Sequence, residues 1–530
     1  MSEPRSDLPT HQVENQPPVR GDIDLLQSDP VLQSHLAAVD RVSVNSLART
    51  LGQARWRQTA REAQRHPPEL VLFDAAGRRL DEVRFHPAYH DLMTLGLQAG
   101  YAVAPWTGGS HLSHAAMVYL FSQVEPGICC PMTMTYAAAP VLNDVPVWRS
   151  RVTAPDYDPR ILPIGQKRAA TLGMAMTEKQ GGSDVRANST LAVPDGEGYR
   201  LTGHKWFCSA PMSDGFLTLA QAPGGLTCFL VPRWLEDGRN AIHLMRLKDK
   251  LGNRSNGSAE IEYQNAFAER IGDEGDGVRT IIRMVHHTRL DTAVAPAGLM
   301  RAALCHAHYW ATHRRAFQRN LIDAPLMRAV LADLVLDWEG ATALGMRVAA
   351  AFDDPNQAGF ARISVALAKF LNNKLAPNFT YECMEVLGGM GYVEDTPLPM
   401  LYREAPLNSI WEGSGNVICL DILRTLAKDP IAANALQGEL EAAKGADRHY
   451  DTALHDHQTR WPGLPAEDQA RWFAERLAVL LTASVLIRQS PGAVADGYVA
   501  TRVAGRHGRV TGAVAGLNHA AILERIGNDV

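Results

Sequence analysis

One carboxylate stands out in the stretch from Ser409 to Asp421, which reads SIWEGSGNVICLD. Glu412 lies there between a tryptophan and a glycine, among apolar and small residues. A carboxylate in water-poor surroundings has a raised pKa and is suited to act as a general base. The same residue would also suit an N-cap or an ion pair at a helix expected over residues 417–426. The local sequence alone supports both interpretations equally.

A second stretch with chemical potential is the loop Gly173 to Asp184, GMAMTEKQGGSD. Its consecutive glycines let the backbone approach a ligand closely, and the hydroxyls of Thr177 and Ser183 flank them. Alone, such a loop is more often a surface turn. A ligand loop is favoured because further short motifs follow it in order: KWFCS at 205–209, GDEGDG at 272–277, RRAF at 314–317, LGGMGY at 387–392 and WEGSGN at 411–416.

The elements that must position these motifs follow from the apolar spacing. Residues 1–32 are rich in Pro, Gln and Asp and predict an extended arm. Helical spacing holds over 33–170, although Gly and Pro interrupt 131–144 and 151–167. Short alternating stretches between turns over 171–275 predict a small antiparallel sheet or barrel. A helical bundle is expected over 276–430, with one helix at 361–387 ending at a Gly-Gly pair, and a further helical unit over 431–530. The fold class is therefore α+β and mainly α.

Composition limits the classes of function. The chain has 530 residues, 46% of them hydrophobic and 21% charged, with a net charge of −5, and this composition is typical of a globular protein with a large core. Seven scattered cysteines without zinc spacing are expected to be reduced core thiols, and no metal site is expected. The N-terminus has no targeting character and no apolar run is long enough to span a membrane, so a cytoplasmic location is expected.

Taken together, the motifs resemble those of the acyl-CoA dehydrogenase family over roughly residues 90–427. More narrowly, TEKQGGSDV, WEGSGN, KDKLGNRSN and a C-terminal extension of about a hundred residues are similar to the branch of that family tied to the adaptive response to DNA alkylation. The resemblance implies the acyl-CoA dehydrogenase-like fold and FAD held noncovalently without a Rossmann domain. It also implies a homo-oligomer, most simply a tetramer built as a dimer of dimers.

The resemblance also assigns roles at the reacting centre. Glu412 matches the base that removes the α-proton of an acyl-CoA thioester, and Arg289 matches an arginine that orients the Glu412 loop. Some family members take the base from the position of Thr288, which cannot serve here.

The FAD contacts are likewise implied by position. Thr177 and the backbone around Met176 would bond the flavin ring, Ser183 would lie at the pyrophosphate, and Phe207 to Ser209 would line the flavin with Ser209 near N5. A second group would reach the FAD of a neighbouring subunit, although Gln318 stands where the family usually has glycine. The complete set of implied FAD contacts is Met176, Thr177, Ser183, Phe207, Ser209, Arg314, Phe317, Glu385, Gly388, Gly389, Ser414 and Asn416, of which Arg314, Phe317, Glu385, Gly388 and Gly389 form the second group.

The C-terminal region raises a second hypothesis. A basic segment there comprises Arg488, Arg502, Arg506 and Arg509, which would contact double-stranded DNA through its phosphates. A solvated helical face or an intersubunit set of ion pairs explains these arginines equally well. Two functions therefore stand: an FAD-binding flavoprotein of the alkylation response with DNA binding and weak or unassigned dehydrogenase activity, or a conventional short- or branched-chain acyl-CoA dehydrogenase of the isovaleryl-CoA type with a structural C-terminal domain. The loop TEKQGGSDV and the motif WEGSGN favour the first, and the intact Glu412 supports the second.

Overall fold

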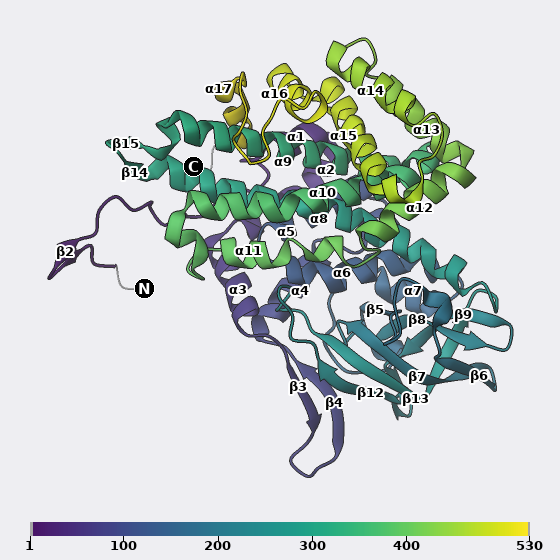
Figure 1. Ribbon diagram of the computed structural model, residues 1–530. Coiled ribbons are helices and arrows are strands. Elements are labelled where there is room, and N and C mark those ends of the chain that lie inside the picture. Colours follow the sequence, from purple (N-terminus) through teal and green to yellow (C-terminus); the bar gives the residue numbers. More distant parts are fainter. Residues whose placement is uncertain (1–3, 528–530) are drawn as a thin grey trace.

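The computed structural model describes residues 4–527 and consists of two helical parts separated by a β domain (Figure 1). The mainly α class predicted from the sequence is confirmed. The helices of the first part are α1 (Pro30–His35), α2 (Ala38–Leu51), α3 (Ala54–Arg65), α4 (Pro87–Gln98), α5 (His111–Ser122), α6 (Pro126–Ala138) and α7 (Pro146–Val152).

The N-terminal arm is shorter than the sequence predicts. A small hairpin of β1 (Asp7–Leu8) and β2 (His11–Gln12) is exposed, but Leu25 and Leu26 are buried in the core. Asp29 is fully buried and caps α1 by accepting a hydrogen bond from the amide of Leu32. Its other carboxylate oxygen lies 3.3 Å from Nε of Arg301 in the second helical part. The prediction of an extended arm up to residue 32 is therefore wrong for its last part, because residues 25–32 fold into the core.

A second difference is a hairpin, β3 (Glu69–Phe73) and β4 (Arg79–Arg84), in a region where only helices were expected. It extends beside β12 (Ile242–Leu247) of the β domain (Figure 1). Asp81 accepts a hydrogen bond of 2.9 Å from the amide of Leu244, and Arg79 donates to the carbonyl of the same residue. The hairpin thus ties the first helical part to the β domain.

The β domain is a mixed sheet that closes on itself. Its strand order is β12-β13-β7-β6-β8-β5, and β9 closes the ring by pairing with both β13 and β8. Most pairs are antiparallel, as expected, but β5 and β6 each pair in parallel with β8. The remaining strands are β5 (Leu172–Ala175), β6 (Leu191–Asp195), β7 (Gly198–Ser209), β8 (Gly215–Ala222), β9 (Gly225–Pro232) and β13 (Ser258–Ile271), with a small outer hairpin of β10 (Trp234–Leu235) and β11 (Gly238–Arg239).

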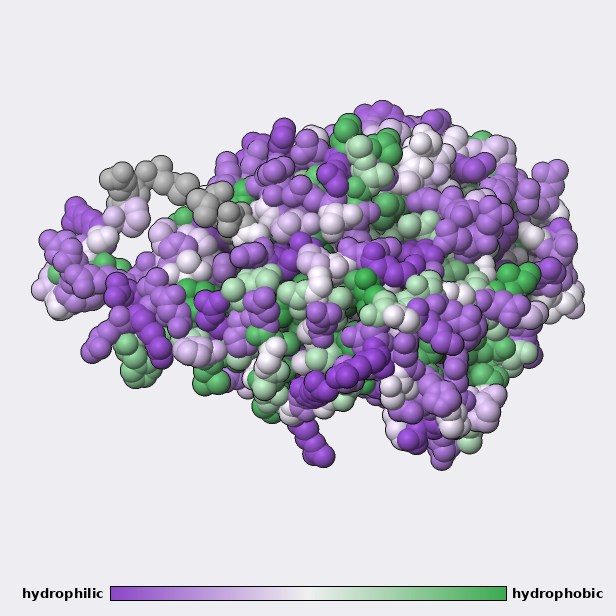
Figure 2. Space-filling view, turned by 90° about the horizontal axis from the view of Figure 1, so that it is seen from above, coloured by the Kyte–Doolittle hydropathy of each residue, from purple (hydrophilic) through white to green (hydrophobic). Residues whose placement is uncertain are grey.

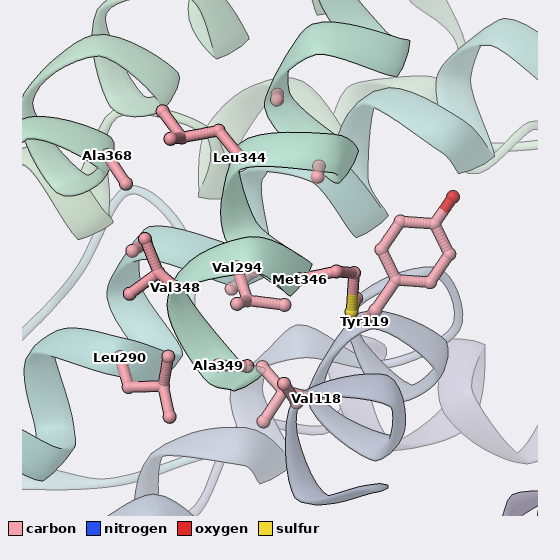
Figure 3. Close-up of a cluster of buried hydrophobic side chains, with 14 of the residues drawn as sticks. Val118, Tyr119, Leu290, Val294, Leu344, Met346, Val348, Ala349 and Ala368 are labelled. Atoms are coloured by element: carbon pink, nitrogen blue, oxygen red, sulfur yellow. The ribbon is translucent and has the colours of Figure 1, made fainter. Parts of the chain in front are cut away.

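Long helices form the core of the second helical part. Val118 and Tyr119 of α5 meet Leu290 and Val294 of α8 and several residues of α9 there (Figure 3). The helix predicted at 361–387 is α10, and Gly388 follows it with φ +60°, a conformation that glycine adopts without steric cost. The helices are α8 (Gly277–His313), α9 (Pro325–Phe352), α10 (Ala358–Val386), α11 (Leu398–Glu404) and α12 (Gly415–Lys428), and a hairpin of β14 (Arg315–Ala316) and β15 (Arg319–Asn320) joins α8 to α9.

The C-terminal helices cover one side of this bundle (Figure 1). The central one, α15, is buried along most of its length and packs against α9 and α10. Among residues 4–527, no helix is both long and apolar enough to span a membrane. These elements are α13 (Pro430–Glu441), α14 (Arg448–Arg460), α15 (Ala470–Gln489), α16 (Gly492–Tyr498), a π-helical turn (Val499–Val503) and α17 (His519–Leu523).

Candidate active site

Glu412 lies on a strained turn just before α12. Its φ is +58°, which is uncommon for a residue with a side chain, and Gly413 follows with φ +102°. Three hydrogen bonds hold the turn. Lys369 of α10 donates to the carbonyls of Asn408 at 2.8 Å and Gly413 at 2.9 Å, and Nε of Arg289 donates to the carbonyl of Glu412 at 3.1 Å. Backbone strain that is fixed by its surroundings is typical of functional sites.

The carboxylate of Glu412 points to α8. Thr288 donates from Oγ1 to Oε2 of Glu412 at 2.7 Å. Burial raises the pKa of Glu412, while this hydrogen bond and the positive charges of Lys369 and Arg289 oppose the rise. Within the described chain the carboxylate forms no ion pair shorter than 4 Å, and the N-cap of α12 is Ser414. The geometry therefore fits a base and neither of the structural roles that the local sequence allowed.

Arg289 contacts the backbone of the Glu412 turn and not its carboxylate. Its Nη1 also donates to Asp421 at 2.7 Å, and Arg362 donates to the other oxygen of Asp421 at 2.8 Å. The arginine is thus fixed between α12 and the turn. These contacts are of the kind a positioning residue makes, and the orienting role that the resemblance implies stays a prediction.

The TEKQGGSD loop and the KWFCS segment of the β domain contact one another. Lys205 of KWFCS and Glu178 of the TEKQGGSD loop form a fully buried ion pair of 2.7 Å, and the amide of Trp206 donates to the carbonyl of Thr177 at 2.7 Å. The loop must carry glycine at Gly182, because a Cβ there would lie 2.5 Å from Oγ1 of Thr177. Thr177 is accordingly held next to the end of β7; Met176 precedes it and Ser183 follows it in the same loop.

That end of β7 carries a partly exposed aromatic side chain. Phe207 is 46% exposed although it lies within a strand, and Cys208 beside it is fully buried. Ser209 is half-buried, and its hydroxyl lies 3.2 Å from that of Ser258. Lys248 lies over the Phe207 ring, with its Nζ 4.7 Å from the ring centroid, so only the part of the ring that Lys248 leaves uncovered could contact a planar ligand.

Ser414 and Asn416 lie at the start of α12, shortly after Glu412 in the chain. The helix has no side-chain cap, so its first amide groups are available to an anion. Lys374 lies close to Gly415, where a Cβ would meet its Nζ at 3.2 Å, and Arg471 of α15 donates to the side chain of Asn416 at 3.0 Å. A helix N-terminus flanked by two cations fits a phosphate group.

The second group of implied FAD contacts lies at the other end of the long helices. Arg289, which contacts the Glu412 turn, is followed by 24 residues of α8 up to His313, or roughly 36 Å of helix. Arg314 and Phe317 lie beyond that end, on the β14–β15 hairpin at the opposite end of the molecule from the β domain (Figure 1). One chain therefore does not bring the two groups together.

This distant group is open to solvent. Phe317 is 93% exposed, and a side chain added at Gly388 or Gly389 would meet only open space. Glu385 is also exposed, on the last turn of α10. Arg314 is bonded within the chain, because its Nη1 donates to the carbonyl of Asn15 in the N-terminal arm at 2.5 Å.

Several residues of the site were not singled out from the sequence. Lys369 is 2% exposed on an otherwise apolar stretch of α10, and burial lowers its pKa to about 7. Lys250 donates to the carbonyl of Asn256 at 2.6 Å and to the hydroxyl of Ser258 at 3.3 Å, beside Ser209. A lysine in an apolar helical stretch is a signal that could have identified Lys369, since lysine is seldom fully buried without a partner.

The KDKLGNRSN segment fastens the β domain to the helices. Asn253 donates from its amide and its side chain to buried Glu404 of α11, at 2.5 and 2.9 Å. Ser255 donates to buried Glu125, the N-cap of α6, at 2.7 Å. This motif, which the sequence offers only as a mark of resemblance, therefore forms a domain contact.

The basic segment of the C-terminal region is split by the structure. Arg502 is ion-paired with Asp333 and with Asp337 at 2.9 Å, and Arg488 is paired with Glu439. The prediction that these two arginines contact DNA is not supported, because carboxylates of their own chain already bind them. Arg506 and Arg509 are exposed on the loop of residues 504–511, which follows the π-helical turn.

The fold and the site define a class of protein, and comparison with known proteins supports the same class. Models of the middle and C-terminal domains of acyl-CoA dehydrogenases match residues 173–266 and 275–427, and the model of the adaptive response protein AidB N-terminal domain matches residues 15–159. The chain belongs to the acyl-CoA dehydrogenase family, whose members are FAD-dependent oxidoreductases.

Within this family the chain is similar to AidB. It is 44% identical over 508 residues to the putative acyl-CoA dehydrogenase AidB of Escherichia coli K12, covering 92% of this chain and 94% of that protein. The structure of Caenorhabditis elegans ACDH-11 in complex with C11-CoA superposes with a TM-score of 0.82 at 28% identity, covering 91% of this chain and 90% of the other. Butyryl-CoA dehydrogenase of Megasphaera elsdenii shares the fold, with a TM-score of 0.60 at 20% identity over 74% of this chain and 99% of the other.

The residues present fit FAD. The partly exposed Phe207 and the glycine loop beside Thr177 would contact the flavin, and the uncapped start of α12 would bind a phosphate.

Proposed function

We propose that this protein oxidises a small or branched acyl-CoA thioester to its α,β-unsaturated product, with Glu412 as the base. The observation that carries the proposal is the geometry of Glu412, a carboxylate with a raised pKa that is held on a strained turn by Thr288, Lys369 and Arg289. A related protein, ACDH-11, was solved with C11-CoA, which supports an acyl-CoA as the substrate but not a particular chain length.

The chemistry requires two C–H bonds to break. The carboxylate of Glu412 would take the α-proton, and the electron pair left behind would form the new C=C bond as a hydride leaves the β-carbon. Bound FAD would supply the acceptor of that hydride. Burial favours the neutral acid that forms when Glu412 takes the proton, and the hydrogen bond from Thr288 keeps the carboxylate directed while it is still ionised.

An anaerobic titration of the FAD-loaded protein with short and branched acyl-CoA thioesters tests this function. We expect at least one thioester to bleach the flavin band stoichiometrically. Glu412→Gln should retain FAD and slow the bleaching by about 10²–10⁴-fold, the range attributed to a positioned base. If no thioester reduces the flavin, or if Glu412→Gln reduces at the wild-type rate, the proposed function is wrong.

We further propose that the FAD site is completed by a second copy of the chain in a homo-oligomer, most simply a tetramer. Phe207 lies in the β domain, whereas Phe317 lies beyond the far end of α8 and is almost fully exposed. Both observations support this arrangement. Phe317→Asp should lower both the FAD content and the assembly size, as measured by absorbance and light scattering. A Phe317→Asp variant that keeps its assembly size and its bound FAD would contradict this arrangement.

As a second candidate function, we propose a role in the DNA alkylation response, with double-stranded DNA as a partner. The exposed loop of residues 504–511 carries Arg506, His507 and Arg509, and the face that bears the C-terminal helices is mostly hydrophilic (Figure 2). The 44% identity to AidB supports the same assignment. Four such loops in a tetramer would act together on one duplex. The negative net charge of a single chain therefore does not oppose DNA binding. Binding of a labelled duplex that weakens with added salt would support this role, and absence of binding at low salt would exclude it.

A further inference from the structure

A cavity of about 350 Å³ lies on the outer side of the site, between the first helical part and the β domain. It is enclosed by β4, α4, the segment of residues 157–171 and the turn of residues 210–214. Pro131 and Ala210 form its inner wall, and they directly follow Cys130 and Ser209 in the chain. Neither the proposed reaction nor the implied FAD contacts use its lining. Its volume falls within the range of small-molecule sites.

One wall of this cavity carries polar groups without partners. Arg233 is 8% exposed, and only its Nε donates, to the carbonyl of Ser213 at 3.2 Å. No hydrogen bond or ion pair in the part of the chain described here uses its two terminal amino groups. The hydroxyl of Ser213, 3% exposed, also has no partner there. The terminal amino groups of Arg233 thus open onto the cavity without a partner, and the hydroxyl of Ser213 is buried without one. A ligand in the cavity that bonds the guanidinium would offset part of the cost of burying this charge.

Four other charged side chains of the cavity lining are already paired with one another. Lys167 donates to Asp214 at 2.7 Å, and the amide of Thr171 donates to the second oxygen of Asp214 at 2.9 Å. Arg160 is paired with Asp158 at 2.6 Å. Glu82 also lines the cavity but lies beyond 4 Å from the nitrogens of Arg233. Arg84 lines the cavity as well, so the four positive side chains of the lining exceed its three carboxylates by one, which matches a single carboxylate ligand.

The opposite wall is apolar and aromatic. Phe85 stacks on Tyr89 with ring centroids 4.0 Å apart, and Met93 and Met212 lie beside them. The hydroxyl of Tyr89 forms no hydrogen bond to any other described residue, so it is a further donor for the ligand. A ligand that satisfies both walls has an anionic head and a compact hydrophobic body.

We propose that this cavity is a second small-molecule site, which binds a compact organic carboxylate with its head on Arg233 and Ser213 and its body against Phe85 and Tyr89. Arg233 is well suited to this role, since a guanidinium binds a carboxylate through two parallel hydrogen bonds.

Calorimetric titration of the FAD-loaded protein with benzoate, phenylacetate and 3-methylbutanoate tests the site, with benzamide as the neutral match of benzoate. We expect at least one carboxylate to bind, and benzamide to bind at least tenfold more weakly than benzoate. Arg233→Met should weaken carboxylate binding at least tenfold. Arg160→Gln is the matched control, because that arginine lines the same cavity but is paired with Asp158, and it should leave binding unchanged.

A second variant keeps the test decisive if Arg233→Met does not fold. Met212→Trp fills the cavity from the half-buried apolar side without removing a charge, and it should also abolish binding. Circular dichroism and FAD content would confirm that each variant is folded. The proposal is overturned if none of the three carboxylates binds at millimolar concentration, or if Met212→Trp binds them as the wild type does. Both results are independent of acyl-CoA oxidation, so the proposed function and this site can fail separately.

Discussion

Thr288 of α8 donates a hydrogen bond of 2.7 Å from its Oγ1 to Oε2 of Glu412. The threonine stands at the position from which some family members are implied to supply the base, and here it contacts the base instead. The contact has two effects: it fixes one rotamer of a carboxylate on a mobile side chain, and it opposes the rise in pKa that burial causes. The pair therefore sets both the direction and the acidity of the reacting group.

The first prediction concerns this contact. Thr288→Val removes the donor, so the pKa of Glu412 should rise further, by about one to two pH units if the bond contributes the ~1.5–3 kcal/mol usual for a charged acceptor. The acidic limb of the pH profile for flavin reduction should move up by the same amount. Thr292→Val, one turn further along α8, is the control, because its hydroxyl bonds only the carbonyl of Arg289. An unchanged pH profile in Thr288→Val would show that Thr288 does not set the pKa of Glu412.

The second prediction concerns Lys369, which bonds two carbonyls of the Glu412 turn. Lys369→Met leaves both carbonyls unsatisfied, so we expect slower flavin reduction with FAD retained and a loss of about 2–4 kcal/mol in stability. Lys428→Met is the control, since that lysine is exposed on the last turn of α12 and outside the contacts of the Glu412 turn and of the proposed FAD site.

The pH dependence of stability tests the same residue independently. Burial lowers the pKa of Lys369 to about 7, so the unfolded chain binds more protons than the folded chain between pH 7 and the ordinary lysine pKa near 10.5. Stability should therefore rise with pH in this window in the wild type, and less so in Lys369→Met. Parallel curves of melting temperature against pH would contradict the assignment.

How far the sequence predicts this site depends on the range of each interaction. The Glu412 motif, the glycine loop and the end of α10 at Gly388 are local features, and the structure has them as turns and helix ends. The fates of Arg488 and Arg502 depend on carboxylates 49 and 169 residues away, so no local pattern could show that these arginines are already paired. The sequence therefore shows a basic segment but does not show which of its arginines are paired with carboxylates of their own chain.

The same limit explains the errors in the fold. Residues 131–138 continue α6 although the chain has a proline at position 131, because tertiary packing buries this helix almost completely. The polar neighbours of residues 25–32 predict an arm, yet Leu25 and Leu26 are buried in the core. In each case long-range burial overrode a local composition signal.

The third prediction separates the C-terminal arginines by role. Replacing Arg506 and Arg509 with glutamine should leave stability within about 0.5 kcal/mol, because both are exposed. Duplex binding should weaken, and the slope of log K against log salt should fall by about two per chain if both contact phosphates. Fluorescence anisotropy of a labelled duplex at several salt concentrations measures both quantities.

Arg502→Gln is the contrasting variant. It leaves Asp333 and Asp337 without their cation and should cost about 3–5 kcal/mol in stability. Because Asp333 also accepts from the amide of Gly512 at 2.8 Å, some loosening of the 504–511 loop is expected at high temperature. A weaker salt slope in Arg502→Gln at a temperature where it is folded, with no change in the Arg506 and Arg509 variant, would reverse the assignment.

The last prediction concerns Glu125, which is fully buried where the KDKLGNRSN segment meets α6. Burial raises the pKa of Glu125 to about 7 against the hydrogen bonds from Ser255, Gln64 and Gly127, and the nearby Glu404 adds to the rise. The folded state therefore holds a proton that the unfolded chain releases above its ordinary pKa of 4.5. This contribution to stability is fully present below about pH 4.5 and is lost as the pH rises to about 7, by about 3 kcal/mol in total. Glu125→Gln, which keeps the shape but cannot ionise, should show a smaller fall in melting temperature between pH 5 and 7.5 than the wild type. Glu441→Gln, on the exposed end of α13, should behave as the wild type. Equal falls in Glu125→Gln and the wild type would show that this carboxyl does not hold its proton in the folded protein.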